Sequence, residues 1–525
     1  MITTQHNKVR LLQPKQFSAK PLSRIPAIRY YALGIALYAT IFTIWQPEQI
    51  PWHIHLTGVV FVALCAYPIV RWSRQQTRQA PMFELLCLAY GLQYGTPLHI
   101  QNNQIWLLSS RVTLAWEDTF RTLCLATLGV AIMMFTYYRV SNSQLAKTVP
   151  KLDLVLAPQK RGLYIFFALT CGILFIFMRT TGSSILSSSR IGAIISLLAN
   201  QAYIALGILS YFLFTGKLSR FAWKWVLYLS LFIMVMLGMS TGMLENTFIP
   251  FVLIFCVRWQ VAGKLPWRLL LLAVLLFLLF QPIKQSFRSE AWVGGSATAV
   301  SVNTRLLVWA NLIEESVMGV FEPNSTTNSF LDANQIRTSM ARFDLLHTSV
   351  YVQSVTPNRI PYYEGKSYAY LLVGWIPRIL WPNKPIAQEA NNIFALDYGF
   401  ITSAQVGKTM TGIGHIAEAF ANFGILGVCL VMSLQGCFFA LINQILNSST
   451  SEGGSAIYLS IMVFFLNGLG SATAAFFASI IQYILAQAVI IRCFTNSFSV
   501  TRSSRTNSTA HFSRLSRRPL VKRIT

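Results

Sequence analysis

The chain has 525 residues, of which 54% are hydrophobic and only 11% are charged. Soluble domains carry about 25% charged residues, so this composition excludes a soluble globular protein. The net charge of +25 at pH 7 would fit a nucleic-acid-binding protein, but no basic face is interleaved with stacking aromatic residues, so we expect no nucleic-acid partner.

The apolar residues come in long blocks. A helix needs roughly 17 to 25 mainly apolar residues to cross a bilayer. Lipid offers no hydrogen-bond partners, so a segment that crosses it must pair its own backbone groups, as a helix does. We therefore predict an all-α, polytopic transmembrane helix bundle of about twelve helices. The predicted spans are residues 30–46, 54–70, 82–98, 119–138, 162–178, 191–215, 221–239, 246–257, 267–281, 411–445, 456–472 and 474–492.

The basic residues predict the orientation of these helices. Most of the 42 Lys and Arg residues lie in the two tails and in alternate short loops, whereas the other short loops hold only Arg111, Arg121, Arg179 and Arg190. Short cytoplasmic loops are enriched in Lys and Arg. We therefore predict a multi-pass protein of the plasma membrane with both termini cytoplasmic, in contact with membrane lipids.

This orientation divides the chain into five segments. They are a basic cytoplasmic tail at 1–29, helices one to nine at 30–281, one large extracytoplasmic loop at 282–410, helices ten to twelve at 411–492, and a basic, disordered cytoplasmic tail at 493–525. Within the loop, residues 303–321 show the spacing of an amphipathic helix, and residues 333–352 are predicted to form a second helix. The prolines that follow predict turns and irregular structure.

The loop holds a first group of candidate catalytic residues, Arg342, Asp344 and His347. On a helix, Asp344 and His347 would share a face, because they are three residues apart. Asp344 would then orient the imidazole, and His347 would be a candidate general base. In the alternative, Arg342 and Asp344 form a local ion pair and His347 is a solvated helix residue.

A second group of residues is basic. Arg378 and Lys384 lie among prolines and aromatic residues at the expected membrane surface, and Arg288 directly follows the ninth predicted span. An Arg fork suits diphosphate oxygens and a Lys adds a point charge, so these residues, with Arg342, are candidate diphosphate ligands. In the alternative, the cations contact ordinary phospholipid head groups.

A third group opens the tenth predicted span, which is long enough to tilt or to begin outside the membrane. His415 and Glu418 are three residues apart there, and such polar groups must face protein or a water-filled cavity rather than lipid. They are a second candidate base pair. The alternative is a structural hydrogen bond between helices, and the nearby glycines Gly414, Gly424 and Gly427 would allow close packing or a bend.

Other chemistries leave no trace in the sequence. The chain has no phosphate-binding P-loop and no G-x-S-x-G nucleophile motif. No His, Cys or carboxylate cluster has the spacing of a metal site. A metal-independent reaction without a cofactor is therefore expected.

At these residues the chain resembles bacterial O-antigen and exopolysaccharide polymerases of the Wzy type, also called oligosaccharide repeat-unit polymerases. The resemblance rests on about a dozen helices, on a single large outer loop late in the chain, and on three sequence segments. These segments are PYYEGKSY at 361–368, IPRILWPNKP at 376–385, and GHIAEAFANFGILG at 414–427. The resemblance is tight over about 340–430 and topological elsewhere.

The resemblance implies a GT-C-like membrane glycosyltransferase that transfers a growing glycan from one undecaprenyl diphosphate carrier to a sugar hydroxyl on another repeat unit. It implies a bacterial inner membrane and undecaprenyl-diphosphate-linked oligosaccharide as substrate. A chain-length regulator and a flippase of the same pathway are possible partners. Arg342, Arg378 and Lys384 would contact the diphosphate, and His347 would be the base.

Three other readings stay open. An O-antigen ligase-like enzyme would move the finished glycan to another acceptor. A transporter or flippase for lipid-linked oligosaccharides would also need many helices and a cationic cavity, but transporters usually show two related halves. An acyltransferase that modifies sugars would use a membrane His and depend on acyl-coenzyme A.

The predicted orientation can be tested without substrate. A reporter fused into the loop near Asn324 should be extracytoplasmic, because the loop lies between two spans on the side opposite the basic segments. Reporter activity in intact cells measures this, and a cytoplasmic reporter would invert the predicted orientation of every helix.

Overall fold

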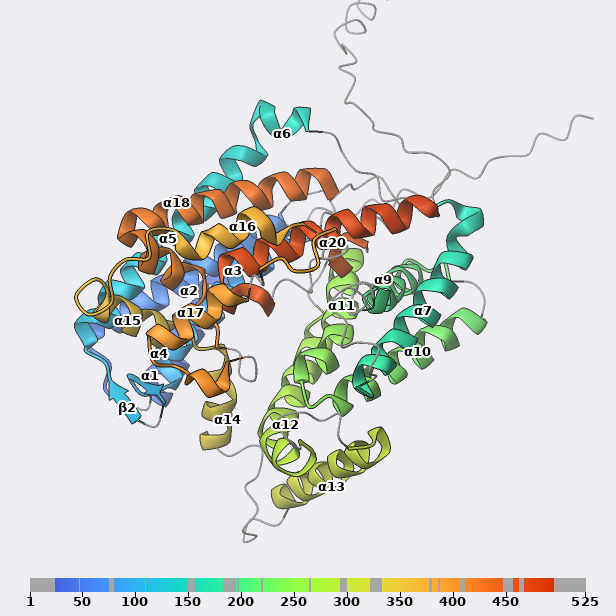
Figure 1. Cartoon of the computed structure of the whole chain (residues 1–525), viewed down its shortest axis with the longest axis horizontal. Coiled ribbons are helices and arrows are strands. Elements are labelled where there is room, and N and C mark those ends of the chain that lie inside the picture. Colours follow the sequence, from blue (N-terminus) through green and yellow to red (C-terminus); the bar gives the residue numbers. More distant parts are fainter. Residues whose placement is uncertain are drawn as a thin grey trace, which may run out of the picture.

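The fold was analysed in a computed structural model of the chain. It describes residues 24–46, 48–74, 80–108, 110–149, 156–182, 195, 198–218, 221–263, 266–292, 300–321, 333–376, 380–385, 388–406, 411–446, 457–461 and 467–494. Most of these residues are helical, and the helices form two groups that lie side by side (Figure 1). We call them the first and the second bundle.

The first bundle contains the N-terminal elements together with α15 and α18. Its N-terminal elements are α1 (Arg24–Trp45), α2 (Trp52–Ser73), α3 (Met82–Tyr90), a π-helical turn η1 (Gly91–Gly95), α4 (Thr96–Ile100), the antiparallel strands β1 (Gln104–Leu107) and β2 (Ser110–Thr113), and α5 (Trp116–Ser141). α18 packs along α5, and α2 packs on both α3 and α5. The end of this bundle that carries the β1–β2 hairpin is called the hairpin end below.

The second bundle follows a short helix, α6 (Gln144–Thr148). It consists of α7 (Pro158–Thr180), α9 (Gln201–Phe214), α10 (Phe221–Ser240), α11 (Leu244–Ala262), α12 (Trp267–Ala291) and α13 (Val302–Phe321). α9 packs on α7 and α11, and α13 packs on α12 and α10. α13 confirms the predicted amphipathic helix at 303–321.

The remaining elements return to the first bundle. They are α14 (Ala333–Met340), the 3₁₀ turn η4 (Ala341–Phe343), α15 (Leu346–Val355), η5 (Lys366–Tyr368), α16 (Ala369–Gly374), α17 (Glu389–Asp397), η6 (Ser403–Gln405), α18 (His415–Leu446), η7 (Asn467–Gly470) and α20 (Thr473–Cys493). They enclose a small core of their own around Tyr363, Phe394 and Tyr398. Burial raises the pKa of Tyr363 above its usual value, so its hydroxyl stays protonated and donates to Asp397 Oδ2 at 2.7 Å.

α20 connects the two bundles. Gln201 of α9 donates from Nε2 to Gln487 Oε1 of α20 at 2.9 Å, and Tyr164 of α7 donates to Gln201 Oε1 at 3.1 Å. All three residues are buried. Within an apolar bundle, unpaired amides would be costly, so these bonds hold the three helices together.

Eight helices are long and apolar enough to cross a membrane, counted over the described residues. They are α2, α5, α7, α10, α11, α12, α18 and α20, and each coincides with a predicted span. The predicted span at 191–215 contains the shorter apolar helix α9, and that at 82–98 contains α3, η1 and part of α4. The chain is therefore a helical, multi-pass membrane protein, while twelve crossings stay a prediction.

Several predicted boundaries were wrong. α12 continues through Pro282 to Ala291 instead of ending at 281. The all-α prediction missed the short β1–β2 hairpin. The helix predicted at 333–352 is two helices, because Asp344 is extended, with φ −76° and ψ 105°.

α18 is also interrupted, at Phe423 and Gly424. Gly424 has a φ of +64°, a conformation that a side chain disfavours. The bend foreseen from the glycines is therefore present, and it separates a short helical segment at 415–422 from the longer one that ends at Leu446.

Arg305 of α13 stabilises the ends of two membrane helices. Its side chain is buried, and it donates from Nη1 to Ser240 O at 2.7 Å and from Nη2 to Thr180 O at 2.8 Å. These carbonyls lie at the C-terminal ends of α10 and α7, where the backbone lacks donors and carries partial negative charge. One cation thus ties α13 across both helix ends.

Replacing Arg305 should destabilise the second bundle. Arg305→Met keeps the apolar stem but leaves two buried carbonyls without donors, which costs about 3 kcal/mol. The unfolding midpoint of the purified protein in detergent measures this loss. The matched control is Arg268→Met, whose side chain is exposed over the Trp267 ring; equal midpoints for the two variants would contradict the role of Arg305.

Candidate functional site

Asp344 and His347 form a close pair at the hairpin end. The break between α14 and α15 turns the carboxylate of Asp344 back over the first turn of α15, where Oδ1 accepts from the His347 backbone N–H at 3.1 Å. Asp344 Oδ2 lies 2.6 Å from His347 Nδ1. The backbone N–H of Leu345 donates to Gln93 O at 3.1 Å, which fixes the pair to η1. The predicted pair is present, but through this local turn and not through a shared helical face.

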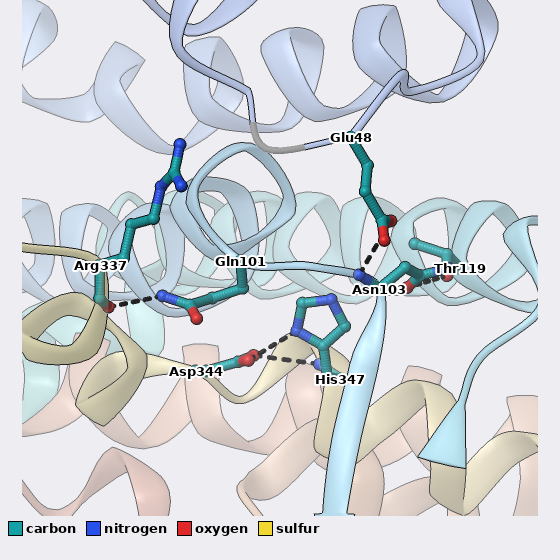
Figure 2. A network of polar contacts seen from close by, with 7 residues as sticks. All are labelled: Glu48, Gln101, Asn103, Thr119, Arg337, Asp344 and His347. Carbon is teal, nitrogen blue, oxygen red and sulfur yellow. Dashed lines mark hydrogen bonds and ion pairs between the residues drawn. The ribbon is translucent and has the colours of Figure 1, made fainter. Parts of the chain in front are cut away.

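In this pair, Asp344 holds the His347 imidazole in a fixed orientation, as is needed in a general base. The side chain of His347 is 3% exposed and that of Asp344 is 15% exposed. A carboxylate on Nδ1 favours the tautomer that carries the proton there, which leaves the lone pair on Nε2. No hydrogen bond of Nε2 is found within the part of the chain that the structure describes, and Figure 2 shows this nitrogen pointing away from Asp344.

Polar residues from the α1–α2 connection, from the segment between α4 and β1, and from α5 and α14 lie around the pair (Figure 2). Asn103 receives a hydrogen bond from Thr119 Oγ1 at 3.1 Å and donates from its backbone to Glu48 Oε2 at 3.3 Å. Gln101 Nε2 donates to Arg337 O at 2.7 Å. The sequence analysis missed these residues, although the polar run 101–104 directly after an apolar block was a usable signal.

Two of the segments that carry the family resemblance are bonded to each other. Asn422 Oδ1 accepts from Gly365 N–H at 3.0 Å, and Asn422 Nδ2 donates to Ser367 Oγ at 2.9 Å. Ser367 in turn donates to Glu418 Oε1 at 2.7 Å, and Glu418 Oε2 accepts from Thr473 N–H at 2.5 Å. We call Glu418, Asn422, Ser367 and their bonds to Gly365 and Thr473 the polar knot. It joins the 363–367 segment, α18 and α20.

His415 and Glu418 face different partners. Both are fully buried, and His415 Nδ1 lies 3.2 Å from Tyr90 Oη, which donates to Gln435 Oε1 at 3.1 Å. The His415 ring packs 4.8 Å from that of Phe476. These contacts match the structural hydrogen bonding between helices that was the alternative reading of this pair.

Among the predicted diphosphate ligands, the structure describes the side chains of Lys384 and Arg288, and these two have separate surroundings. Lys384 is buried, and its Nζ donates to Gly374 O at 2.6 Å and to Ile376 O at 2.5 Å. The Arg288 guanidinium lies 4.3 Å over the Trp292 ring, in the second bundle. Arg342 is in η4, two residues before Asp344, but its side chain lies outside the described residues, as does all of Arg378.

The described residues contain no group of three or more His, Cys, Asp or Glu that could hold a metal ion. Acid–base chemistry by an Asp-oriented imidazole is the reaction type that the arrangement favours.

An isosteric change at Glu418 distinguishes a structural role in the polar knot from a catalytic role. Glu418→Gln sets an NH₂ group against one of two buried donors, so we expect a loss of about 1–3 kcal/mol in stability, seen as a lower unfolding midpoint in detergent. Glu364→Gln, at an exposed position of the bonded segment, is the control. A Glu418→Gln protein of unchanged stability would contradict the structural role.

Comparison with known proteins places the chain in one family. No curated protein and no solved structure matches the chain. The model of a family described as a domain of unknown function, DUF8712, matches residues 157–498, which include the Asp344–His347 pair and the polar knot. Because this match covers more than half of the chain, the chain belongs to the DUF8712 family.

Proposed function

We propose that the chain is a membrane glycosyltransferase that polymerises undecaprenyl-diphosphate-linked oligosaccharide repeat units into O-antigen or exopolysaccharide. The observation that carries the proposal is the Asp344–His347 pair, with Nδ1 bonded to the carboxylate at 2.6 Å. An oriented imidazole among membrane helices, next to segments that resemble repeat-unit polymerases, fits transfer to a sugar hydroxyl.

In the proposed reaction, His347 Nε2 removes the proton of an acceptor hydroxyl. The acceptor oxygen then forms a bond to the anomeric carbon of the donor, and the bond between that carbon and the diphosphate oxygen breaks. Asp344 stabilises the imidazolium that forms. The electron pair leaves with the lipid diphosphate, whose charge needs cations beside it.

Arginines are the better candidates for those cations. The Lys384 ammonium already donates to two backbone carbonyls, and a group held in this way has less to offer a diphosphate. We assign the diphosphate contact to Arg342, two residues before Asp344, and to Arg378 of the IPRILWPNKP segment. The Arg fork matches diphosphate oxygens better than a Lys does.

The proposal includes the orientation predicted from the basic loops. The hairpin end then faces the extracytoplasmic side of a bacterial inner membrane, and both termini are cytoplasmic. Exposed Trp52 and Trp106 at the hairpin end fit an interfacial aromatic belt. A lipid-linked donor would present its diphosphate at this level.

Loss of the base should abolish polymer formation. His347→Ala should lower the rate roughly 10²–10⁴-fold, the contribution of a general base, and Asp344→Asn should lower it less. The measurement is glycan length on a gel from deletion cells that express each variant at equal level. The control is Ser354→Ala, on the same helix, where the exposed Ser354 side chain donates to Tyr351 O.

Single, unpolymerised repeat units in the deletion strain and in His347→Ala would support the polymerase. Long glycan that stays on its lipid carrier would instead identify a ligase. Normal polymer in both strains would contradict the proposal and favour a transporter or a sugar-modifying enzyme.

A further inference from the structure

A cavity of about 500 Å³ lies between α5, α15 and α18. Gln353 lines it from α15. His347 precedes Gln353 by six residues on the same helix, which corresponds to roughly 240° of rotation about the axis. The cavity therefore lies on another side of α15 than His347, and it is separate from the site proposed above.

The cavity has an apolar wall that continues onto the outside of the bundle. Leu125 and Leu128 of α5 line it, together with Phe420 and Ile425 on either side of the α18 bend. Leu128 is 44% exposed and Ile425 is 58% exposed. Because α5 and α18 have the length and composition of membrane spans, these exposed residues face lipid. An acyl chain can enter from the bilayer without crossing a polar barrier.

The end of the cavity nearest the N-terminus of α5 is charged. Glu117, Asp118 and Arg121 line it from the first two turns of α5. Arg121 Nε lies 3.3 Å from Glu117 Oε1, and both side chains are more than half exposed. An exposed pair of this kind is weak, so a ligand can replace it at little cost.

We propose that this cavity binds a zwitterionic aminophospholipid such as phosphatidylethanolamine. The acyl chain lies along Leu125, Leu128 and Ile425, and the phosphate accepts from Arg121. The ammonium group donates to Glu117 and Asp118. An anionic lipid would leave these two carboxylates facing negative charge, and a choline lipid offers them no N–H donor.

Native mass spectrometry of the full-length protein in detergent tests the proposal. The purified protein is titrated separately with phosphatidylethanolamine, phosphatidylglycerol and phosphatidylcholine. Phosphatidylethanolamine should bind about tenfold more tightly than the other two, as expected when hydrogen bonds to charged groups are gained. Asp118→Asn and Arg121→Ala should each remove most of this preference.

Two further variants make the result specific to the cavity. Leu125→Trp fills the apolar wall and should lower binding of all three lipids. Arg111→Ala removes an exposed arginine of the hairpin, which stacks over Trp106, and should change nothing. Equal binding of the three lipids, tighter binding of phosphatidylglycerol, or a preference that survives Asp118→Asn would each overturn the proposal.

Discussion

The lack of hydrogen-bond partners in lipid governs how this chain uses its polar residues. Inside the bundles, a polar side chain that has a partner finds it within the protein. Several such side chains lie where two helices or segments meet, and their hydrogen bonds join these elements. The polar knot joins the 363–367 segment to α18 and α20 through Glu418 and Asn422. Arg305 donates to carbonyls at the C-terminal ends of two helices. Lys384 donates to the carbonyl of Gly374 at the end of α16. Among the described residues, His347 keeps Nε2 without a hydrogen bond while a carboxylate holds its Nδ1.

Much of the fold was predictable because apolar block length is a strong signal. The eight membrane-length helices each match a predicted block. The boundaries failed where a local backbone effect competed with composition. Pro282 did not end α12, since a helix can accommodate a proline when neighbouring structure supports it. The extended Asp344 divides the helix predicted at 333–352 into two, because its carboxylate bonds the turn that follows it.

The site was predictable only in part. Spacing identified Asp344 and His347, since residues three apart meet across one turn whether the carboxylate sits inside the helix or just before it. Spacing could not distinguish this pair from His415 and Glu418, which have the same separation. The two pairs differ in their partners from distant segments. His415 is hydrogen-bonded to Tyr90, whereas Glu418 accepts from Ser367 and from the backbone of Thr473. Such contacts between distant residues are invisible to a reading of one chain segment at a time.

The amide pair that joins α9 to α20 has a consequence for biosynthesis. Gln201 and Gln487 are separated by 286 residues, so at about 5–20 residues per second the ribosome needs roughly 15 to 60 s to supply the second partner. Throughout that interval, α9 lacks its bond to Gln487, while Tyr164 of α7 is already present. The bond that ties the second bundle to α20 can therefore form only after the C-terminal helix has been made.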